Sequence, residues 1–270
     1  MPISDLTSQA ITDLVSLGGR VAVVTGAANG TGAGVARRLA EAAAVVVITD
    51  ADAETAAEAA QVLDAGAGRI HGLALDVSDA ASFAALSSDV KAQFGPIRIW
   101  VNNAGIYPAG PFLEMEADDW DHVLDHNLRG AFLGCRTAAR EMVTNGTGGV
   151  IVNIGSISSF RAPYAGMSHY VSSKFGLRGL TQALAVELGS HGIRVLGVAP
   201  TFTVTEGTRA RRSDLDDAAY KRYIEKVGAT KPLRRVAVPD DVARVVLFCV
   251  SDLSSYMTGA TLPVDGGDLA

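Results

Sequence analysis

Cysteine is scarce in this sequence: Cys135 and Cys249 stand far apart in apolar or helical surroundings. They form no motif that resembles a metal knuckle or a redox pair, so we expect a reducing compartment. His122 and His126 are four residues apart, but no third ligand stands near them in the sequence. We therefore expect no metal ion.

Long apolar runs and an excess of positive charge are also missing. No run of about eighteen apolar residues occurs, so we expect no membrane span, and residues 1–17 do not resemble a signal peptide. The net charge of −6 argues against nucleic-acid binding, which needs a clustered positive surface. The one dense basic stretch, 209–212, is followed at once by acidic residues and indicates a solvated segment. These absences favour a cytoplasmic protein that binds neither nucleic acid nor a membrane.

What is abundant is apolar sequence, at 48% of residues against 19% charged, which suits a large core. Short β-branched runs alternate with Ala-rich amphipathic stretches, a pattern typical of parallel strands joined by helical crossovers. We predict an α/β fold: a single doubly wound, Rossmann-like domain with helices on both faces of a seven-stranded parallel sheet. Strands are expected at 20–25, 44–50, 69–76, 98–102, 150–155, 192–198 and 260–264. Helices are expected at 31–42, 53–65, 79–93, 116–143, 169–189 and 239–252.

No linker, composition shift or repeat marks a domain boundary. We predict an N-terminal extension at 1–18 and one domain at 19–270. Residues 201–236 interrupt the alternation, are unusually charged and follow a strand end, where such folds bind their ligands. They are the best candidate for a mobile substrate lid.

A glycine-rich turn, TGAANGTG at 25–32, joins the first expected strand to a helix. Glycine permits unusual backbone angles and a close approach of a pyrophosphate, and the free N–H groups at the helix start favour that anion. The spacing departs from the usual Gly-x-Gly-x-x-Gly, because Val35 stands at the place of the last glycine. On its own the motif is equally compatible with an ordinary turn.

Asp50 ends the second expected strand, twenty residues beyond Gly30. A carboxylate there can accept hydrogen bonds from the adenosine ribose and would repel a 2′-phosphate. Ala28, Asn29 and Ala51 supply no positive charge for such a phosphate. The sequence therefore favours NAD over NADP, with a helix-capping role for Asp50 as the alternative.

Four motifs occur in the order of one known family: the glycine turn, Asn-Asn-Ala-Gly at 102–105, Ser156, and Tyr170-x-x-x-Lys174. The sequence resembles the short-chain dehydrogenase/reductase family over residues 19 to about 267. The resemblance implies an NAD-binding catalytic domain that interconverts a secondary alcohol and a ketone by hydride transfer. It also implies a homotetramer built from the long central helices and the last helix with its strand.

The proton chemistry depends on a tyrosine whose ordinary pKa is about 10. Tyr170 and Lys174 share one helical face, so we expect Lys174 to lower the pKa of Tyr170. The resemblance implies that Tyr170 is the general acid/base, that Lys174 also binds the nicotinamide ribose, and that Ser156 polarises the substrate oxygen. Ser156 precedes Tyr170 by fourteen positions, one more than is common in the family, so Ser158 is an alternative. Asn127 would hold a water in a proton relay, or merely bend its helix.

The resemblance assigns Asp76 and Val77 to the adenine, 103–105 to the adenosine and nicotinamide ribose, and 200–205 to the carboxamide. The family usually has Pro-Gly where this chain has Pro200-Thr201, and an aliphatic residue at Thr31. The complete set of expected cofactor contacts is Gly26, Asn29, Gly30, Thr31, Gly32, Asp50, Asp76, Val77, Asn103, Ala104, Gly105, Tyr170, Lys174, Pro200, Thr203 and Thr205.

Two other functions stay open. An NADPH-dependent 3-oxoacyl-carrier-protein reductase is the first, because residues 232–235 and 264–267 resemble that branch, although Asp50 counts against it. A non-catalytic NAD-binding sensor is the second. The substrate is expected to be moderately hydrophobic, and Arg161 or residues 209–212 could bind a carboxylate if the lid folds inward. The expected pocket walls are Tyr107, Phe112, Phe160, Tyr164, Met167 and Phe202.

Overall fold

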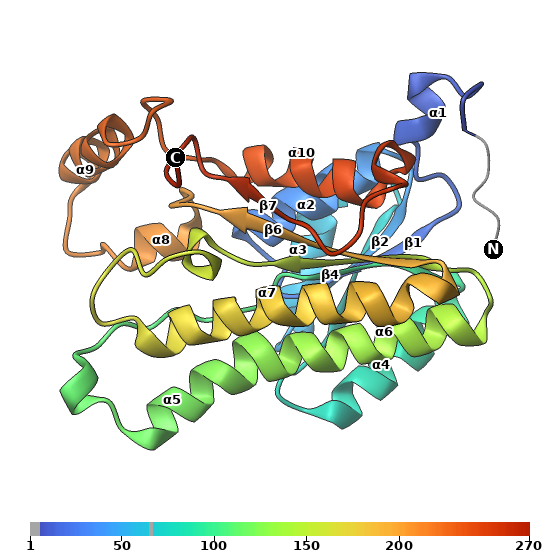
Figure 1. The fold of residues 1–270 in the computed structure, drawn as a ribbon, viewed down its shortest axis with the longest axis horizontal. Helices are drawn as coiled ribbons and strands as arrows, with labels where there is room; N and C mark the ends of the chain where they lie inside the picture. The colour runs from blue at the N-terminus through green and yellow to red at the C-terminus, as the bar shows by residue number, and fades with distance from the viewer. Residues whose placement is uncertain (1–5, 65–66) are drawn as a thin grey trace.

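The computed structural model describes residues 6–64 and 67–270. Within these residues seven strands form one sheet in the order β3-β2-β1-β4-β5-β6-β7, and every neighbouring pair is parallel (Figure 1). The predicted seven-stranded parallel α/β fold is confirmed. The strands are β1 Val21–Val24, β2 Val45–Asp50, β3 Ile70–Ala74, β4 Ile97–Asn102, β5 Gly149–Ile154, β6 Ile193–Pro200 and β7 Thr261–Val264.

The strand order places the ligand crevice. From β1 the chain winds outward through β2 to β3, then returns to β4 on the other side of β1 and continues to β7. The winding direction therefore reverses between β1 and β4. In open parallel sheets the carboxyl ends of the strands at such a reversal form the usual ligand-binding crevice.

Helices cover both faces of the sheet (Figure 1). One apolar core lies beneath α2, α3 and α10, and a second lies beneath α4, α6 and α7. The strands are therefore buried on both faces, which explains their nearly continuous apolar sequences. The α-helices are α1 Ile11–Val15, α2 Gly30–Glu41, α3 Ala53–Asp64, α4 Ala80–Phe94, α5 Ala117–Leu124, α6 Gly130–Thr144, α7 Ser168–Leu188, α8 Glu206–Ala210, α9 Asp217–Ala229 and α10 Pro239–Val250.

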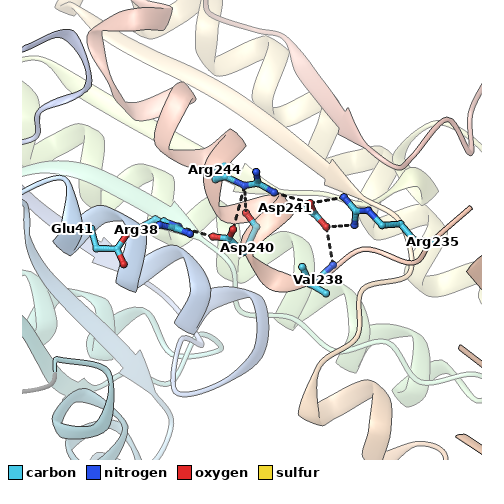
Figure 2. Close-up of polar contacts among 7 residues, drawn as sticks. All are labelled: Arg38, Glu41, Arg235, Val238, Asp240, Asp241 and Arg244. Carbon is cyan, nitrogen blue, oxygen red and sulfur yellow. Dashed lines mark hydrogen bonds and ion pairs between the residues drawn. The ribbon is translucent and has the colours of Figure 1, made fainter. Parts of the chain in front are cut away.

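An ion-pair network joins α2 to the start of α10 (Figure 2). Arg38 of α2 contacts Asp240 at 2.6 Å, and Arg244 contacts both Asp240 and Asp241. Arg235 binds Asp241 through two nitrogens, at 2.5 and 2.8 Å, and this interaction lowers the pKa of Asp241 to about 2. Because Arg235 closes the 201–236 segment, the network fixes the end of that segment to the helix that begins at the glycine turn.

The helix predicted at 116–143 is divided by a wider turn. α5 passes into a π-helical stretch, Asp125–Arg129, before α6 begins. Asn127 lies in that stretch and its side chain binds both main-chain groups of Ile106. A π-turn adds one residue to the helix and is frequent at functional sites. Here it turns the Asn127 amide toward the segment that follows β4.

The predicted lid segment contains two helices that the sequence pattern did not predict, α8 and α9. They lie together at one end of the molecule, at the left in Figure 1.

In the predicted extension, α1 has no buried residue, yet Leu17 is fully buried in the core beneath α2. Residues 1–5 of the extension and residue 65 of the helix predicted at 53–65 lie outside the described residues. Among those described, no helix is long and apolar enough to cross a membrane.

Candidate active site

A cavity of about 540 Å³ lies at the carboxyl ends of the strands and extends from the turn after β1 to the segment after β6. Gly32 and Asn127 are the two expected site residues that do not line it. The expected residues that do are Gly26, Asn29, Gly30, Thr31, Asp50, Asp76, Val77, Asn103, Ala104, Gly105, Ser156, Tyr170, Lys174, Pro200, Thr203 and Thr205.

Glycine is required at two points of the turn, since Gly26 and Gly30 both have φ of +58°. Gly32 lies beneath the turn, where an added Cβ would stand 2.5 Å from Nδ2 of Asn103. That amide donates hydrogen bonds to the carbonyls of Thr25 and Gly26. Gly32 does not line the cavity; the absence of a side chain at this position lets the turn pack closely on Asn103.

The start of α2 already holds an anion of the chain itself. Gly30 is the first residue of α2, and its N–H donates a hydrogen bond to a carboxylate oxygen of Glu206 at 3.1 Å. Free N–H groups at a helix start bind carboxylate and phosphate by the same interaction. The residues at this end of the cavity therefore fit the pyrophosphate of a dinucleotide.

The end of the cavity formed by Asp50 and Asp76 carries negative charge. Asp50 ends β2, and hydrogen bonds from Ser78 lower the pKa of Asp76. Among the described residues that line the cavity, Lys174 is the only lysine or arginine. It stands beside Tyr170, so the end formed by Asp50 and Asp76 presents carboxylate acceptors and no lysine or arginine side chain.

Tyr170 and Lys174 both project from α7 into the cavity. The Lys174 ammonium is buried, donates a hydrogen bond to the carbonyl of Ile154 at 2.9 Å, and lies 5.7 Å from the centre of the Tyr170 ring. Burial lowers the pKa of Lys174 to about 8. The charge of Lys174 is therefore costly to keep in this place.

The expectation that Lys174 lowers the pKa of Tyr170 is wrong for this structure. Burial of the phenol raises the pKa of Tyr170, and the hydrogen bond with the Ser156 hydroxyl offsets only part of that rise. The Lys174 ammonium is directed to the Ile154 carbonyl and faces the ring, so it supplies too little charge at the phenol oxygen to outweigh burial.

Ser156 follows β5 and its hydroxyl lies beside Tyr170. It accepts a hydrogen bond from the N–H of Ser158 at 3.1 Å and also bonds with the phenol of Tyr170. Ser158 lines the cavity too, but its main chain serves to orient Ser156. Of the two serines, Ser156 is therefore the one whose hydroxyl faces the Tyr170 phenol.

Asn127 supports the cavity from beneath. Its amide exchanges two hydrogen bonds with Ile106, at 2.8 and 2.7 Å, and donates a third to Ser173. A Cβ at Gly105 would stand 3.0 Å from the Asn127 oxygen and 3.8 Å from Lys174 Nζ. Glycine at 105 therefore allows Asn127 and Lys174 to approach the same point. The water relay expected for Asn127 stays a prediction.

Four of the six expected pocket walls line the cavity: Tyr107, Tyr164, Met167 and Phe202. The expectation was wrong for the other two. Phe112 is 67% exposed, and Phe160 packs beneath the guanidinium of Arg178 at 4.3 Å.

The arginines proposed as carboxylate binders are engaged elsewhere. Arg161 pairs with Asp268, and Arg209 pairs with Asp217. Arg211 and Arg212 stack on the rings of Tyr107 and Tyr223, at 4.5 and 5.0 Å. None of the four lines the cavity.

Thr201, which replaces the usual glycine of the family, has a partner in the C-terminal turn. Its hydroxyl donates a hydrogen bond to Asp268 at 2.7 Å, and Asp268 also binds Lys231 and Arg161. Burial alone would raise the pKa of Asp268, but the hydrogen bonds from Lys231 and Thr201 hold it below its usual range. One carboxylate therefore joins the 201–236 segment, the loop before α7 and the C-terminal turn.

We predict that Asp268→Asn lowers the free energy of unfolding by about 3 kcal/mol near neutral pH, because Lys231 stays buried without its counter-charge. The pKa of Asp268 is depressed, so its contribution is present above the ordinary pKa and is lost as the pH falls through the depressed one. Urea unfolding at neutral and acid pH measures this. The matched control, Asp252→Asn, breaks a more exposed pair with Arg20 and should cost under about 1 kcal/mol. Equal losses for the two variants would contradict the prediction.

Two residues at the site were not predicted from the sequence: Glu206, which binds the first N–H of α2, and His126, which lines the cavity. Glu206 directly follows an expected cofactor contact, Thr205, and that adjacency was its only signal. His126 lines the cavity beside Asp76, and its position next to Asn127 could have suggested this. The described residues contain no cluster of three or more His, Cys, Asp or Glu side chains that could hold a metal ion.

The doubly wound fold, the anion-binding turn and the Ser, Tyr and Lys side chains in one cavity define an oxidoreductase that uses a nicotinamide cofactor. The chain belongs to the short-chain dehydrogenase/reductase family. Residues 26–268 match the family model described as enoyl-(acyl carrier protein) reductase.

Several relatives match nearly the whole chain. D-threitol dehydrogenase of Mycolicibacterium smegmatis is 39% identical over 93% of this chain and 93% of its own length. The 3-oxoacyl-(acyl-carrier-protein) reductase of Pseudomonas aeruginosa is 38% identical over 94% of this chain and 98% of its own. The crystal structure of a gluconate 5-dehydrogenase from Burkholderia cenocepacia, in complex with NADP and tartrate, is 33% identical with a TM-score of 0.86, covering 96% of this chain and 98% of that one.

Proposed function

We propose that this chain is an NAD-dependent oxidoreductase that interconverts a secondary alcohol and a ketone by hydride transfer. The observation that carries the proposal is the meeting of Ser156, Tyr170 and Lys174 at one end of a cavity whose other end holds the glycine turn and Asp50. A nicotinamide cofactor supplies or accepts the hydride when it is bound. Every other role belongs to residues of this chain.

In this proposal Ser156 donates a hydrogen bond to the substrate oxygen, and the phenol of Tyr170 exchanges a proton with that same oxygen. Lys174 holds the nicotinamide ribose. Asn127 positions the segment after β4 through its two hydrogen bonds with Ile106, and its side chain packs against Gly105. The raised pKa of Tyr170 suits the phenol that protonates a ketone, so alcohol oxidation should accelerate as the pH rises.

The remaining cofactor contacts are proposed from position in the cavity. Asn29, Gly30 and Thr31 would hold the pyrophosphate, and Asp76 with Val77 the adenine. Asn103, Ala104 and Gly105 lie between the adenosine and the nicotinamide ribose. Pro200, Thr203 and Thr205 would hold the carboxamide. All of these residues line the cavity.

NAD is proposed over NADP because of Asp50. The related gluconate 5-dehydrogenase carries NADP, so family membership leaves the choice open.

We expect Asp50→Ala to lower the ratio of kcat/KM for NAD to that for NADP by about tenfold or more, or 1.4 kcal/mol for each factor of ten. The carboxylate that repels a 2′-phosphate is then removed. Glu58→Ala, an exposed change of the same charge on α3, should leave the ratio unaltered. A ratio unchanged in Asp50→Ala would contradict the role of this residue.

The substrate is proposed to be a moderately hydrophobic alcohol or ketone, since Tyr107, Tyr164, Met167 and Phe202 wall the cavity. A second candidate is NADPH-dependent reduction of 3-oxoacyl thioesters, which the Pseudomonas aeruginosa relative favours. A homotetramer and a cytoplasmic location stay predictions from the sequence.

Turnover of NAD(H) and NADP(H) against aryl, alicyclic, terpenoid, polyol and 3-oxoacyl compounds tests the proposal. NAD-linked turnover of one hydrophobic class would support it. NADPH-only reduction of 3-oxoacyl thioesters would replace it by the second candidate. Tight NAD binding without turnover of any compound would indicate a sensor instead of an enzyme.

A further inference from the structure

Glu206 of the 201–236 segment reaches back to the phosphate turn. It is the first residue of α8, and one of its carboxylate oxygens accepts the N–H of Gly30, 176 positions earlier in the chain. The contact is supported from beside it, because a Cβ at Gly30 would stand 3.3 Å from the methyl carbon of Thr205. Two consecutive residues of the segment therefore rest on the first residue of α2.

This carboxylate binds the N–H group to which the proposed function assigns the pyrophosphate. Gly30 carries one of the free N–H groups at the start of α2, and the partial positive charge of the helix is concentrated there. One N–H cannot donate fully to two anions, and two anions held within a few Å repel each other. Cofactor binding thus requires the Glu206 carboxylate to leave.

We infer that Glu206 competes with the cofactor pyrophosphate for the start of α2 and thereby sets the affinity for nucleotides that carry a pyrophosphate. The inference rests on the proposed cofactor site. It assigns the 203–210 part of the chain two positions: one in which Glu206 binds Gly30, and one in which the pyrophosphate does. Entry of the cofactor then releases the same segment that carries the proposed carboxamide contacts Thr203 and Thr205.

A purely local role for Glu206 predicts a different result. Glu206 lies in the first turn of α8, where an acidic side chain stabilises its own helix. In that case its removal would weaken α8 and would leave nucleotide affinity unchanged or reduced. Competition instead predicts tighter binding, and only for ligands with a pyrophosphate.

The test compares ADP, which has a pyrophosphate and no nicotinamide, with adenosine, which has neither. Calorimetry measures ADP, and displacement of ADP measures adenosine. We expect Glu206→Gln to lower the Kd for ADP by about fivefold, and Glu206→Ala, which also removes the hydrogen-bond acceptor, by about tenfold. Adenosine affinity should change by less than about twofold in both variants. Glu225→Gln, an equal charge change at an exposed site on α9, should alter neither ligand.

An ADP affinity that is unchanged or weaker in both Glu206 variants would overturn the inference, and so would an equal gain for adenosine. Circular dichroism of the variants separates loss of folding from loss of competition. Binding of NADH to the unaltered protein keeps this outcome apart from failure of the proposed function. If the unaltered protein binds neither NADH nor ADP, the proposed cofactor site itself is wrong.

Discussion

Tyr170→Phe is expected to lower kcat by about a thousandfold while the Kd for NADH changes by less than about threefold. General acid/base catalysis by a positioned side chain typically contributes about a hundredfold to ten-thousandfold, and phenylalanine keeps the ring that packs edge-on against Tyr107. Only the hydroxyl beside Ser156 is lost. The effect should therefore appear in the chemical step and leave cofactor binding intact.

Steady-state turnover and quenching of protein fluorescence by NADH measure the two quantities. Tyr256→Phe, at a tyrosine that is 91% exposed, is the matched control and should retain full activity. Survival of more than a few per cent of the turnover in Tyr170→Phe would remove this residue from its proposed role. A parallel loss of NADH affinity would point to a structural role instead.

Lys174→Met is expected to lower kcat by about a hundredfold or more and to raise the free energy of unfolding of the unliganded protein by about 1–2 kcal/mol at pH 7. The pKa of Lys174 is lowered from 10.5 to about 8 by burial, so the buried charge destabilises the folded protein by about 3 kcal/mol. Removing the charge relieves this destabilisation, and loss of the hydrogen bond to the Ile154 carbonyl offsets about 1–2 kcal/mol of the relief. Methionine fills a similar volume without charge.

The pH dependence of this stability gain has a defined sign. Below about pH 8 Lys174 is charged in both the folded and unfolded chains, so the cost of burial is fully present. Between about pH 8 and 10.5 the folded protein releases a proton that the unfolded chain retains, so the unaltered protein gains stability as the pH rises. The difference in Tm between Lys174→Met and the unaltered protein should therefore narrow from pH 7 to pH 9. Lys226→Met, at an exposed position on α9, should show no such difference. A lower Tm for Lys174→Met at pH 7 would contradict the proposed cost of burying the Lys174 charge.

Much of the site follows from the sequence because a parallel sheet brings all its strand ends to one edge. Once the strands are located, the residues that follow them must meet there, whatever their distance in the sequence. This is why the turn after β1, Asp50 after β2 and Ser156 after β5 could be placed together in advance. The helical spacing of Tyr170 and Lys174 placed the last two groups on one face.

What the sequence did not predict depends on contacts between distant segments. The π-turn at Asn127 is stabilised by the main chain of Ile106, and the Thr201 hydroxyl finds Asp268 only after the chain has folded. α8 and α9 lie in a charged stretch whose apolar periodicity is weak. The raised pKa of Tyr170 likewise reflects burial, a property of the assembled cavity that residue spacing does not reveal.

Hydride transfer between a carbinol carbon and a nicotinamide in this cavity can be followed by isotope labelling. The most direct measurement uses a secondary alcohol from the responsive class with deuterium on its carbinol carbon, NAD as the cofactor, and mass spectrometry of the reduced nicotinamide. We expect one deuterium in each NADH formed and none in the NADH pool of Tyr170→Phe beyond its residual turnover. Reduced cofactor without deuterium, or conversion of the alcohol without any reduced cofactor, would contradict hydride transfer at this site.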